Sequence, residues 1–316
     1  MKIFITGIAG FVGFHLARTL RKRGNFVIGC DNFNNYYDPQ LKRDRAAELA
    51  KEGITLIESD IRNPPLLEKL ILDHEITHFV HLAAQAGVRH SIKHPEQYVY
   101  SNLDGFVQVM EVVRRHPHIK FIYASSSSVY GLNTKIPFAE TDPTDRPASL
   151  YGATKKSNEL IAHSYHHMFG VSVTGLRFFT VYGPWGRPDM AYFSFTNAIL
   201  EGRTLQIYNQ GQMKRDFTYV DDIIAGTIAA IDLGAPLEIF NLGNSQPEDV
   251  MSLVRIIEKL TGKQAQLEML PVQPGEVPVT YADISKSQAA LKFSPRTSLE
   301  QGLEKFLSWY LPYYQR

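Results

Sequence analysis

The sequence predicts an α/β protein: a Rossmann-type, doubly wound parallel sheet followed by a smaller C-terminal α/β domain. Three observations lead to this fold class. Apolar segments of strand length alternate with helical patterns as far as residue 177, and such alternation implies parallel strands joined by helices. A glycine-rich turn joins the first strand to the first helix. A Gly- and Pro-rich segment at 178–188 then interrupts the alternation.

The elements of the first part are predicted in order along the chain. The strands are expected at residues 2–6, 26–30, 55–59, 77–82, 120–124 and 171–177. The helices between them are expected from the glycine turn to residue 23, and then at 41–51, 64–73, 95–116 and 151–169. Residues 1–180 are therefore interpreted as a nucleotide-binding domain.

The second part, residues 181–316, is interpreted mainly as a substrate-binding domain, some of which returns to the large domain. Its helices are expected at residues 190–201, 221–233, 248–261 and 298–310. Its strands are expected at residues 205–208, 214–219, 237–242 and 266–270.

The composition argues against several classes of function. The 33 Lys and Arg residues balance 32 Asp and Glu residues, which argues against nucleic acid as a partner. The only cysteine, Cys30, excludes an intramolecular disulfide and a multi-cysteine metal site. No apolar run reaches the roughly 18–20 residues of a membrane span, and the chain enters strand-like sequence directly at Met1. These features predict a cytoplasmic protein without a membrane partner.

The glycine turn predicts a dinucleotide site. Gly7, Gly10 and Gly13 form the pattern GxxGxxG between a strand and a helix, which suits close approach of a pyrophosphate to a helix N-terminus. Asp31 ends the second strand, where a carboxylate accepts hydrogen bonds from ribose hydroxyls and repels a 2′-phosphate. The sequence therefore favours NAD over NADP.

Other candidates for cofactor contact follow the glycine turn or lie at later strand ends, where ligands of parallel sheets collect. Ala83 and Ala84 are small enough to let a cofactor pass close to the backbone. The remaining candidates are Phe11, Val12, Asn32, Asp60, Ile61, Leu82 and Asn102.

Tyr151 and Lys155 predict an acid–base site. Their four-residue spacing puts them on one helical face. A nearby ammonium favours the phenolate, whose unperturbed pKa of about 10 is too high for a base near neutrality. Ser126, from the run 125–128, would share the transferred proton. Taken alone, this spacing fits an ordinary amphipathic helix better.

Longer segments resemble the extended short-chain dehydrogenase/reductase family, and within it the sugar-nucleotide epimerases. The resemblance covers essentially the whole chain. Three parts of it, SSSSVYG (125–131), GPWGRPDM (183–190) and MKRDFTYVDD (213–222), resemble the UDP-glucuronate 4-epimerase subgroup. The UDP-galactose epimerases commonly have asparagine where Thr180 stands here. The matching segments are TGIAGFVG (6–13), HLAAQAGVRHS (81–91), YASSSSVYG (123–131), YGATKKSNE (151–159), RFFTVYGPWGRPDM (177–190) and MKRDFTYVDDI (213–223).

The resemblance implies a tightly bound NAD+ that is regenerated in each cycle, and a UDP-sugar substrate. Tyr151 would be the base at the 4-hydroxyl, Ser126 would relay the proton, and Lys155 would hold the ribose and lower the pKa of Tyr151. The implied reaction is epimerisation of UDP-glucuronate to UDP-galacturonate through a 4-keto intermediate.

The same resemblance suggests contacts to the substrate. Arg187 is the preferred cation for the uronate carboxylate, with a diphosphate or uridine contact as an almost equal alternative. Arg215 resembles the family's diphosphate-binding arginine, and Arg89 is a weaker candidate for that role. Ser127, Ser128 and Thr180 are further candidates for the carboxylate pocket.

Several alternatives stay open at this point. The next candidate is UDP-glucuronate decarboxylase, which shares the first chemical step, followed by a neutral hexose epimerase and a non-catalytic NAD-binding sensor.

The family also implies a homodimer in which the helices near 95–116 and 151–169 form a four-helix bundle. His163, His166 and His167 share one helical face, but exposed or interface histidines are favoured over a metal site, so no metal is expected.

Overall fold

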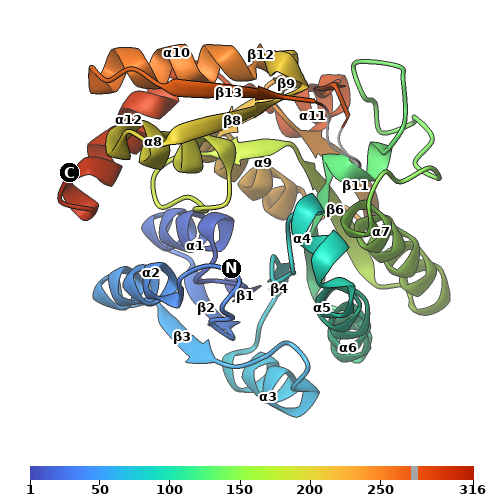
Figure 1. The fold of residues 1–316 in the computed structure, drawn as a ribbon. Coiled ribbons are helices and arrows are strands. Elements are labelled where there is room, and N and C mark those ends of the chain that lie inside the picture. The colour runs from blue at the N-terminus through green and yellow to red at the C-terminus, as the bar shows by residue number, and fades with distance from the viewer. Residues whose placement is uncertain (272–276) are drawn as a thin grey trace.

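A seven-stranded parallel sheet lies at the centre of the computed structural model, which describes residues 1–271 and 277–316 (Figure 1). The strand order is β3-β2-β1-β4-β5-β6-β11. The order reverses direction between β1 and β4, which is the position where doubly wound sheets bind ligands. The strands are β1 (Lys2–Thr6), β2 (Phe26–Asp31), β3 (Thr55–Glu58), β4 (His78–His81), β5 (Lys120–Ser126), β6 (Ser172–Phe178) and β11 (Leu237–Leu242).

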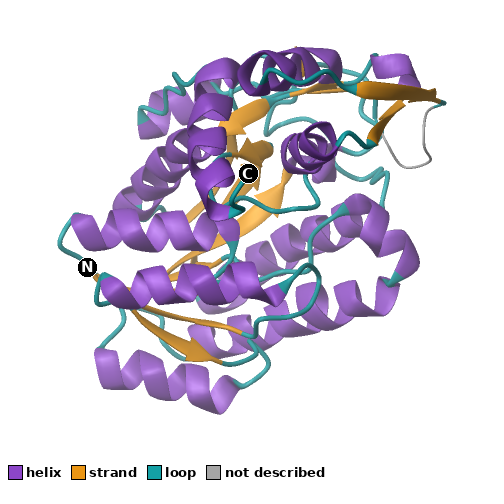
Figure 2. Cartoon of the chain, turned by 60° about the vertical axis from the view of Figure 1, so that its left-hand side comes forward, coloured by secondary structure: helices purple, strands orange, loops and turns teal. Residues whose placement is uncertain are grey.

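Helices cover both faces of this sheet (Figure 2). One face carries α1 (Phe11–Lys22), α2 (Pro39–Lys51) and α9 (Val220–Leu233). The other carries α3 (Pro64–His74), α6 (Gly105–Arg114) and α7 (Leu150–Phe169). Three shorter segments precede α6: α4 (Val88–Lys93), α5 (Pro95–Tyr98) and the π-helical turn η1 (Val99–Asp104), and the last two run directly into it.

Alternation along the strands explains the two cores. Ile3 and Ile5 of β1 pack with α1, whereas Phe4 between them packs with α3 and α6. Successive side chains of a strand point to opposite faces, so a strand buried on both faces is apolar throughout. This arrangement confirms the predicted Rossmann-type doubly wound fold.

The later chain forms a smaller layer above the sheet (Figure 1). Its helices are α8 (Ala191–Glu201), α10 (Val250–Thr261) and α12 (Leu299–Tyr313), whereas α11 (Ser285–Leu291) packs against α9 and β11 of the large domain. Its strands are β7 (Thr180–Tyr182), β8 (Thr204–Tyr208), β9 (Lys214–Arg215), β10 (Phe217–Tyr219), β12 (Glu248–Asp249), β13 (Gln266–Leu270) and β14 (Val279–Thr280). The 3₁₀ turns are η2 (Ser127–Tyr130) and η3 (Asn209–Gly211).

The prediction of one strand at 214–219 is wrong, because Asp216 divides it. Lys214–Arg215 pairs with β12 and β14, whereas Phe217–Tyr219 pairs with β7. The buried Asp216 carboxylate accepts hydrogen bonds from the backbone N–H groups of Asn244, Ser245 and Ala282. A buried carboxylate needs such partners, and these lie in other segments of the chain.

Within 1–271 and 277–316, no helix is long and apolar enough to cross a membrane. Over the same ranges, no group of three or more His, Cys, Asp or Glu side chains is placed to hold a metal ion.

Candidate active site

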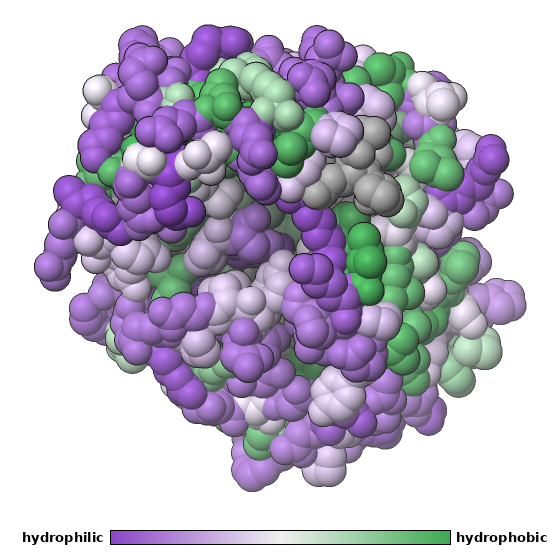
Figure 3. All heavy atoms as spheres, viewed as in Figure 1, coloured by the Kyte–Doolittle hydropathy of each residue, from purple (hydrophilic) through white to green (hydrophobic). Residues whose placement is uncertain are grey.

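A cavity opens at the carboxyl ends of the sheet strands, and the surface is hollowed there (Figure 3). It is lined by residues that are far apart in the sequence, among them the glycine turn and Arg187. The candidates that line it are Gly7, Gly10, Phe11, Val12, Gly13, Asp31, Asn32, Asp60, Ile61, Leu82, Ala83, Ala84, Ser126, Tyr151, Lys155 and Arg187.

The glycine turn is tightly closed. Gly7 has a φ of 69°, which favours glycine, and its carbonyl accepts a hydrogen bond from the Gly10 N–H at 2.9 Å. A Cβ atom on Gly13 would lie 2.2 Å from the Gly7 carbonyl oxygen. Helix α1 begins directly after Gly10, with no acidic residue in its first turn. Its N-terminal N–H groups and dipole therefore suit a pyrophosphate.

We expect Gly13→Ala to abolish retention of the cofactor, because the new methyl group would force the turn apart. The measurement is the amount of NAD released from purified, acid-denatured protein. Gly170→Asn is the matched control, since Gly170 has a φ of 68° with open space around it and asparagine tolerates that conformation. Full NAD content in Gly13→Ala would contradict binding of the cofactor pyrophosphate by this turn.

Asp31 lies at the end of β2 and is held by the backbone. Its carboxylate accepts hydrogen bonds from the N–H groups of Ala9 at 3.1 Å and Phe33 at 2.9 Å. Burial raises its pKa, and the positive charge of Lys42 opposes this rise. Lys42 also lines the cavity. It is not among the residues predicted from the sequence, because a lysine within a polar helix is usually exposed.

Tyr151 and Ser126 line the cavity and are joined by a hydrogen bond. Ser126 ends β5, and Tyr151 lies in the first turn of α7, whose start is capped by Ser149 through the Gly152 N–H at 3.1 Å. Burial raises the pKa of Tyr151, and a hydrogen bond with Ser126 and the charge of Arg187 oppose this rise. Arg187 thus favours the phenolate, a role that the sequence predicts for Lys155 alone.

Lys155 is buried one helical turn beyond Tyr151. Its Nζ donates a hydrogen bond to the Ala124 carbonyl at 2.8 Å. Burial lowers its pKa to about 8, against the raising effect of Glu159. At pH 7 Lys155 is therefore mostly protonated, and it retains two N–H donors for a ligand in the cavity.

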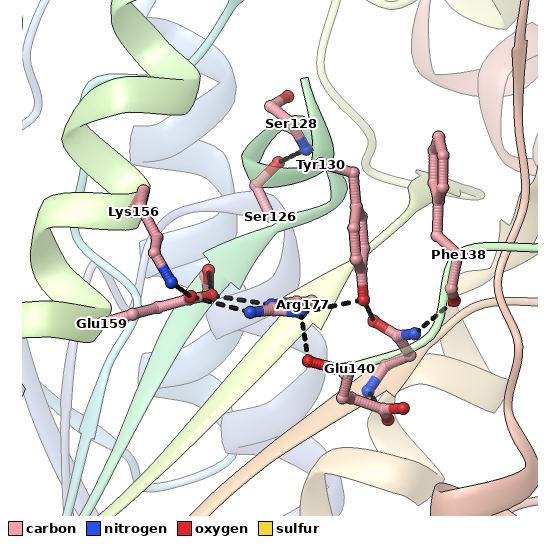
Figure 4. A network of polar contacts seen from close by, with 10 residues as sticks. Ser126, Ser128, Tyr130, Phe138, Glu140, Lys156, Glu159 and Arg177 are labelled. Atoms are coloured by element: carbon pink, nitrogen blue, oxygen red, sulfur yellow. Dashed lines mark hydrogen bonds and ion pairs between the residues drawn. The ribbon is translucent and has the colours of Figure 1, made fainter. Parts of the chain in front are cut away.

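A buried polar network fixes α7 against the sheet (Figure 4). Arg177 of β6 donates two hydrogen bonds to Glu159 of α7, at 2.8 and 2.9 Å. Ser125 donates to the same carboxylate at 2.7 Å. Since Ser125 precedes Ser126, the network fixes the strand end and the helix that carry the candidate catalytic groups. Loss of one partner would leave a buried charge uncompensated.

The other candidates do not line this cavity. The Asn102 side chain bonds both backbone groups of Gln85, at 2.8 and 2.9 Å, and so shapes the loop after β4. The Arg89 guanidinium lies over the Tyr208 ring, and Arg215 donates to the Lys214 and Pro278 carbonyls. Ser127, Ser128 and Thr180 lie in η2 and β7, beside the strand ends that border it.

Comparison with known proteins decides the family. The sequence profile described as the NAD dependent epimerase/dehydratase family matches residues 3–243. The chain belongs to this family. Among its curated relatives, UDP-glucuronate 4-epimerase 4 of Arabidopsis thaliana is 51% identical over 99% of this chain and 76% of its own length. Protein CapI of Staphylococcus aureus is 46% identical over the full length of both.

A solved structure of this epimerase family agrees over the whole chain. The UDP-glucuronic acid 4-epimerase of Bacillus cereus, in complex with UDP-glucuronic acid and NAD, superposes with a TM-score of 0.93. It is 38% identical and covers 99% of this chain and 100% of its own. These relatives bear out the resemblance that the sequence segments indicate.

Proposed function

We propose that this protein is an NAD-dependent 4-epimerase of UDP-glucuronate that produces UDP-galacturonate. One observation carries the proposal: Ser126, Tyr151, Lys155 and Arg187 line the same cavity as the glycine turn and Asp31. The proposed reaction needs a base, a proton relay and a cation for a carboxylate beside the turn that binds the dinucleotide, and the shared cavity supports this assignment. The relatives named for UDP-glucuronate support this choice of substrate.

Each residue of the site has its own role in the proposed reaction. Bound NAD+ would accept hydride from carbon 4 of the sugar and return it to the opposite face. Tyr151 takes the proton of the 4-hydroxyl, Ser126 relays it, and Lys155 donates hydrogen bonds to the ribose of the cofactor. The glycine turn holds the pyrophosphate, and Asp31 accepts hydrogen bonds from the adenine ribose. Tight binding keeps the cofactor in place from one cycle to the next.

The substrate contacts stay proposals. Arg187 is assigned to the carboxylate, together with the hydroxyl groups of Ser127, Ser128 and Thr180. Arg215, and with less support Arg89, is assigned to the diphosphate. In this proposal residues 1–180 bind NAD and residues 181–316 mainly bind the UDP-sugar, while β11 completes the nucleotide-binding sheet. The cytoplasm remains the predicted compartment.

Proton NMR of UDP-glucuronate with purified protein and no added NAD tests the function. A galacto-configured uronate that keeps its carboxylate is the expected product. Carbon dioxide and a keto-pentose or xylose species would instead identify a decarboxylase. The absence of any conversion, even with NAD supplied, would overturn the uronate assignment.

We also propose a homodimer in which α7 and the α5–η1–α6 helix form a four-helix bundle. Large apolar side chains are exposed on these helices: Leu160 (60%), Met168 (55%), Phe169 (43%), Val99 (49%) and Tyr100 (51%). Green surface is visible over the neighbouring α4–α6 region at the right of Figure 3. Burial of such surface in a second copy is favourable.

Leu160→Asp is expected to turn the dimer into a monomer, because the carboxylate would have to lose its hydration at the interface. The measurement is molar mass by light scattering during gel filtration. Leu72→Asp is the matched control, since Leu72 is 61% exposed on α3, outside the bundle helices. A wild-type monomer, or a Leu160→Asp dimer, would contradict this interface.

A further inference from the structure

Three successive carbonyl groups of the loop at 183–190 are held by side chains from the nucleotide-binding half. His15 of α1 approaches the Pro184 carbonyl through Nε2 at 2.8 Å. Arg45 of α2 donates to the Trp185 carbonyl through Nε at 3.0 Å and Nη2 at 2.6 Å, and to the Gly186 carbonyl at 3.0 Å. The next residue in the loop is Arg187, which lines the cavity.

Arg45 also reaches the cofactor side of the cavity. Its Nη1 donates to the Ala9 carbonyl in the glycine turn at 3.0 Å and to the Tyr37 hydroxyl at 2.8 Å. The side chain is fully buried, and all five of its N–H donors are used. One guanidinium thereby joins three segments that border the cavity: the glycine turn, the loop after β2 and the loop that carries Arg187.

The loop is held in a conformation that needs support. Trp185 has a φ of 59°, a left-handed value that costs free energy in a residue with a side chain. Beyond it, Arg187 donates two hydrogen bonds to Asp189, at 3.0 and 2.6 Å, and Tyr36 donates to the same carboxylate at 2.9 Å. The clamped carbonyls thus fix the loop backbone before Arg187, and Asp189 fixes the Arg187 guanidinium.

We propose that Arg45 is a positioning residue for uronate recognition, which it supports by fixing the loop so that Arg187 meets the carboxylate. This inference rests on the proposed function. Arg45 itself touches neither the sugar nor the reacting atoms, and its effect passes through Arg187. A lysine at this position offers three donors from a single nitrogen, so it cannot hold the three segments together.

A double-mutant cycle tests the proposal. Arg45→Lys, Arg187→Gln and the double variant are compared with wild type, all saturated with NAD+, by calorimetric titration of UDP-glucuronate and UDP-glucose. We expect Arg45→Lys to lower the preference for the uronate about 10-fold, because it weakens the hydrogen bond between Arg187 and the carboxylate, and hydrogen bonds to charged groups are strong. In the Arg187→Gln background the same change should lower it less than about 2-fold, since coupled residues are not additive.

Arg43→Lys is the matched control on α2, because Arg43 lies at the surface and pairs with Glu58. Its preference for the uronate should equal that of wild type. Equal losses from Arg45→Lys in both backgrounds, or equal losses for both ligands, would overturn the positioning role. If Arg45→Lys does not fold, His15→Ala replaces it in the cycle with a smaller effect of the same kind, and additivity there would again overturn the proposal.

The cycle also separates this inference from the proposed function. A wild-type protein that shows no preference for UDP-glucuronate would remove the uronate assignment. A wild-type preference combined with an additive cycle would leave that assignment in place and remove only the role of Arg45.

Discussion

Tyr151→Phe is expected to lower kcat by about 10²- to 10⁴-fold, the range that general acid–base groups supply. The substitution removes the hydroxyl that bonds to Ser126 and that receives the substrate proton in the proposed mechanism. The ring remains, so the packing against Tyr98 and the cavity wall is retained. KM for UDP-glucuronate and the content of bound NAD should therefore change little. Initial rates of epimer formation and the NAD content of the purified variant are the measurements.

Tyr165→Phe provides the control on the same helix. The Tyr165 hydroxyl donates to Glu111 at 2.7 Å, away from the cavity, so its loss should leave kcat unchanged. If Tyr151→Phe kept kcat within about 10-fold of wild type, the loss would fall below what a general base supplies, and another group would have to remove the proton.

The sequence predicts this site well where local pattern determines position. Alternation of strands and helices places Asp31, Ala83 and Ser126 at the carboxyl edge of a parallel sheet, and all three line the cavity. Helical spacing likewise places Tyr151 and Lys155 one turn apart in α7. These features depend on short apolar strand segments and on the helical period of 3.6 residues, which are visible within a short window.

Features that depend on distant partners are not visible in the sequence. Arg45 and Lys42 look like ordinary charges of a polar helix, yet both are buried, and Arg45 bonds to carbonyls 140 and 141 residues away. The position of Asn102 also depends on a distant partner, because its side-chain amide hydrogen-bonds to the Gln85 backbone, 17 residues away. A buried charge is possible only where the fold brings acceptors to it, and no local pattern records where those acceptors come from.

Arg187→His is expected to divert part of the turnover from epimerisation to release of carbon dioxide. A 4-keto sugar with a carboxylate on carbon 5 is a β-keto acid, which loses carbon dioxide when the breaking bond aligns with the carbonyl. In wild type, Asp189 accepts two hydrogen bonds from the Arg187 guanidinium and one from Tyr36. The guanidinium is thereby held so that it can fix the plane of the carboxylate with two parallel hydrogen bonds. Histidine offers one donor when neutral and has no planar fork, so the carboxylate could rotate into the reactive alignment.

The expected measurement is a proton NMR time course that shows a 4-keto-pentose signal, with carbon dioxide released in equal amount. KM for UDP-glucuronate should also rise about 10-fold or more, because a hydrogen bond between charged groups is lost.

Arg187→Lys is the control: it keeps the charge but not the bidentate geometry. We expect Arg187→Lys to restore KM more fully than it restores the ratio of epimer to carbon dioxide. This difference separates the attraction of the carboxylate, which needs only a positive charge, from the control of its plane, which needs two parallel hydrogen bonds. If Arg187→His slowed turnover without any carbon dioxide, Arg187 would bind the substrate without protecting it, and that protection would have to come from the hydroxyl groups of Ser127, Ser128 and Thr180.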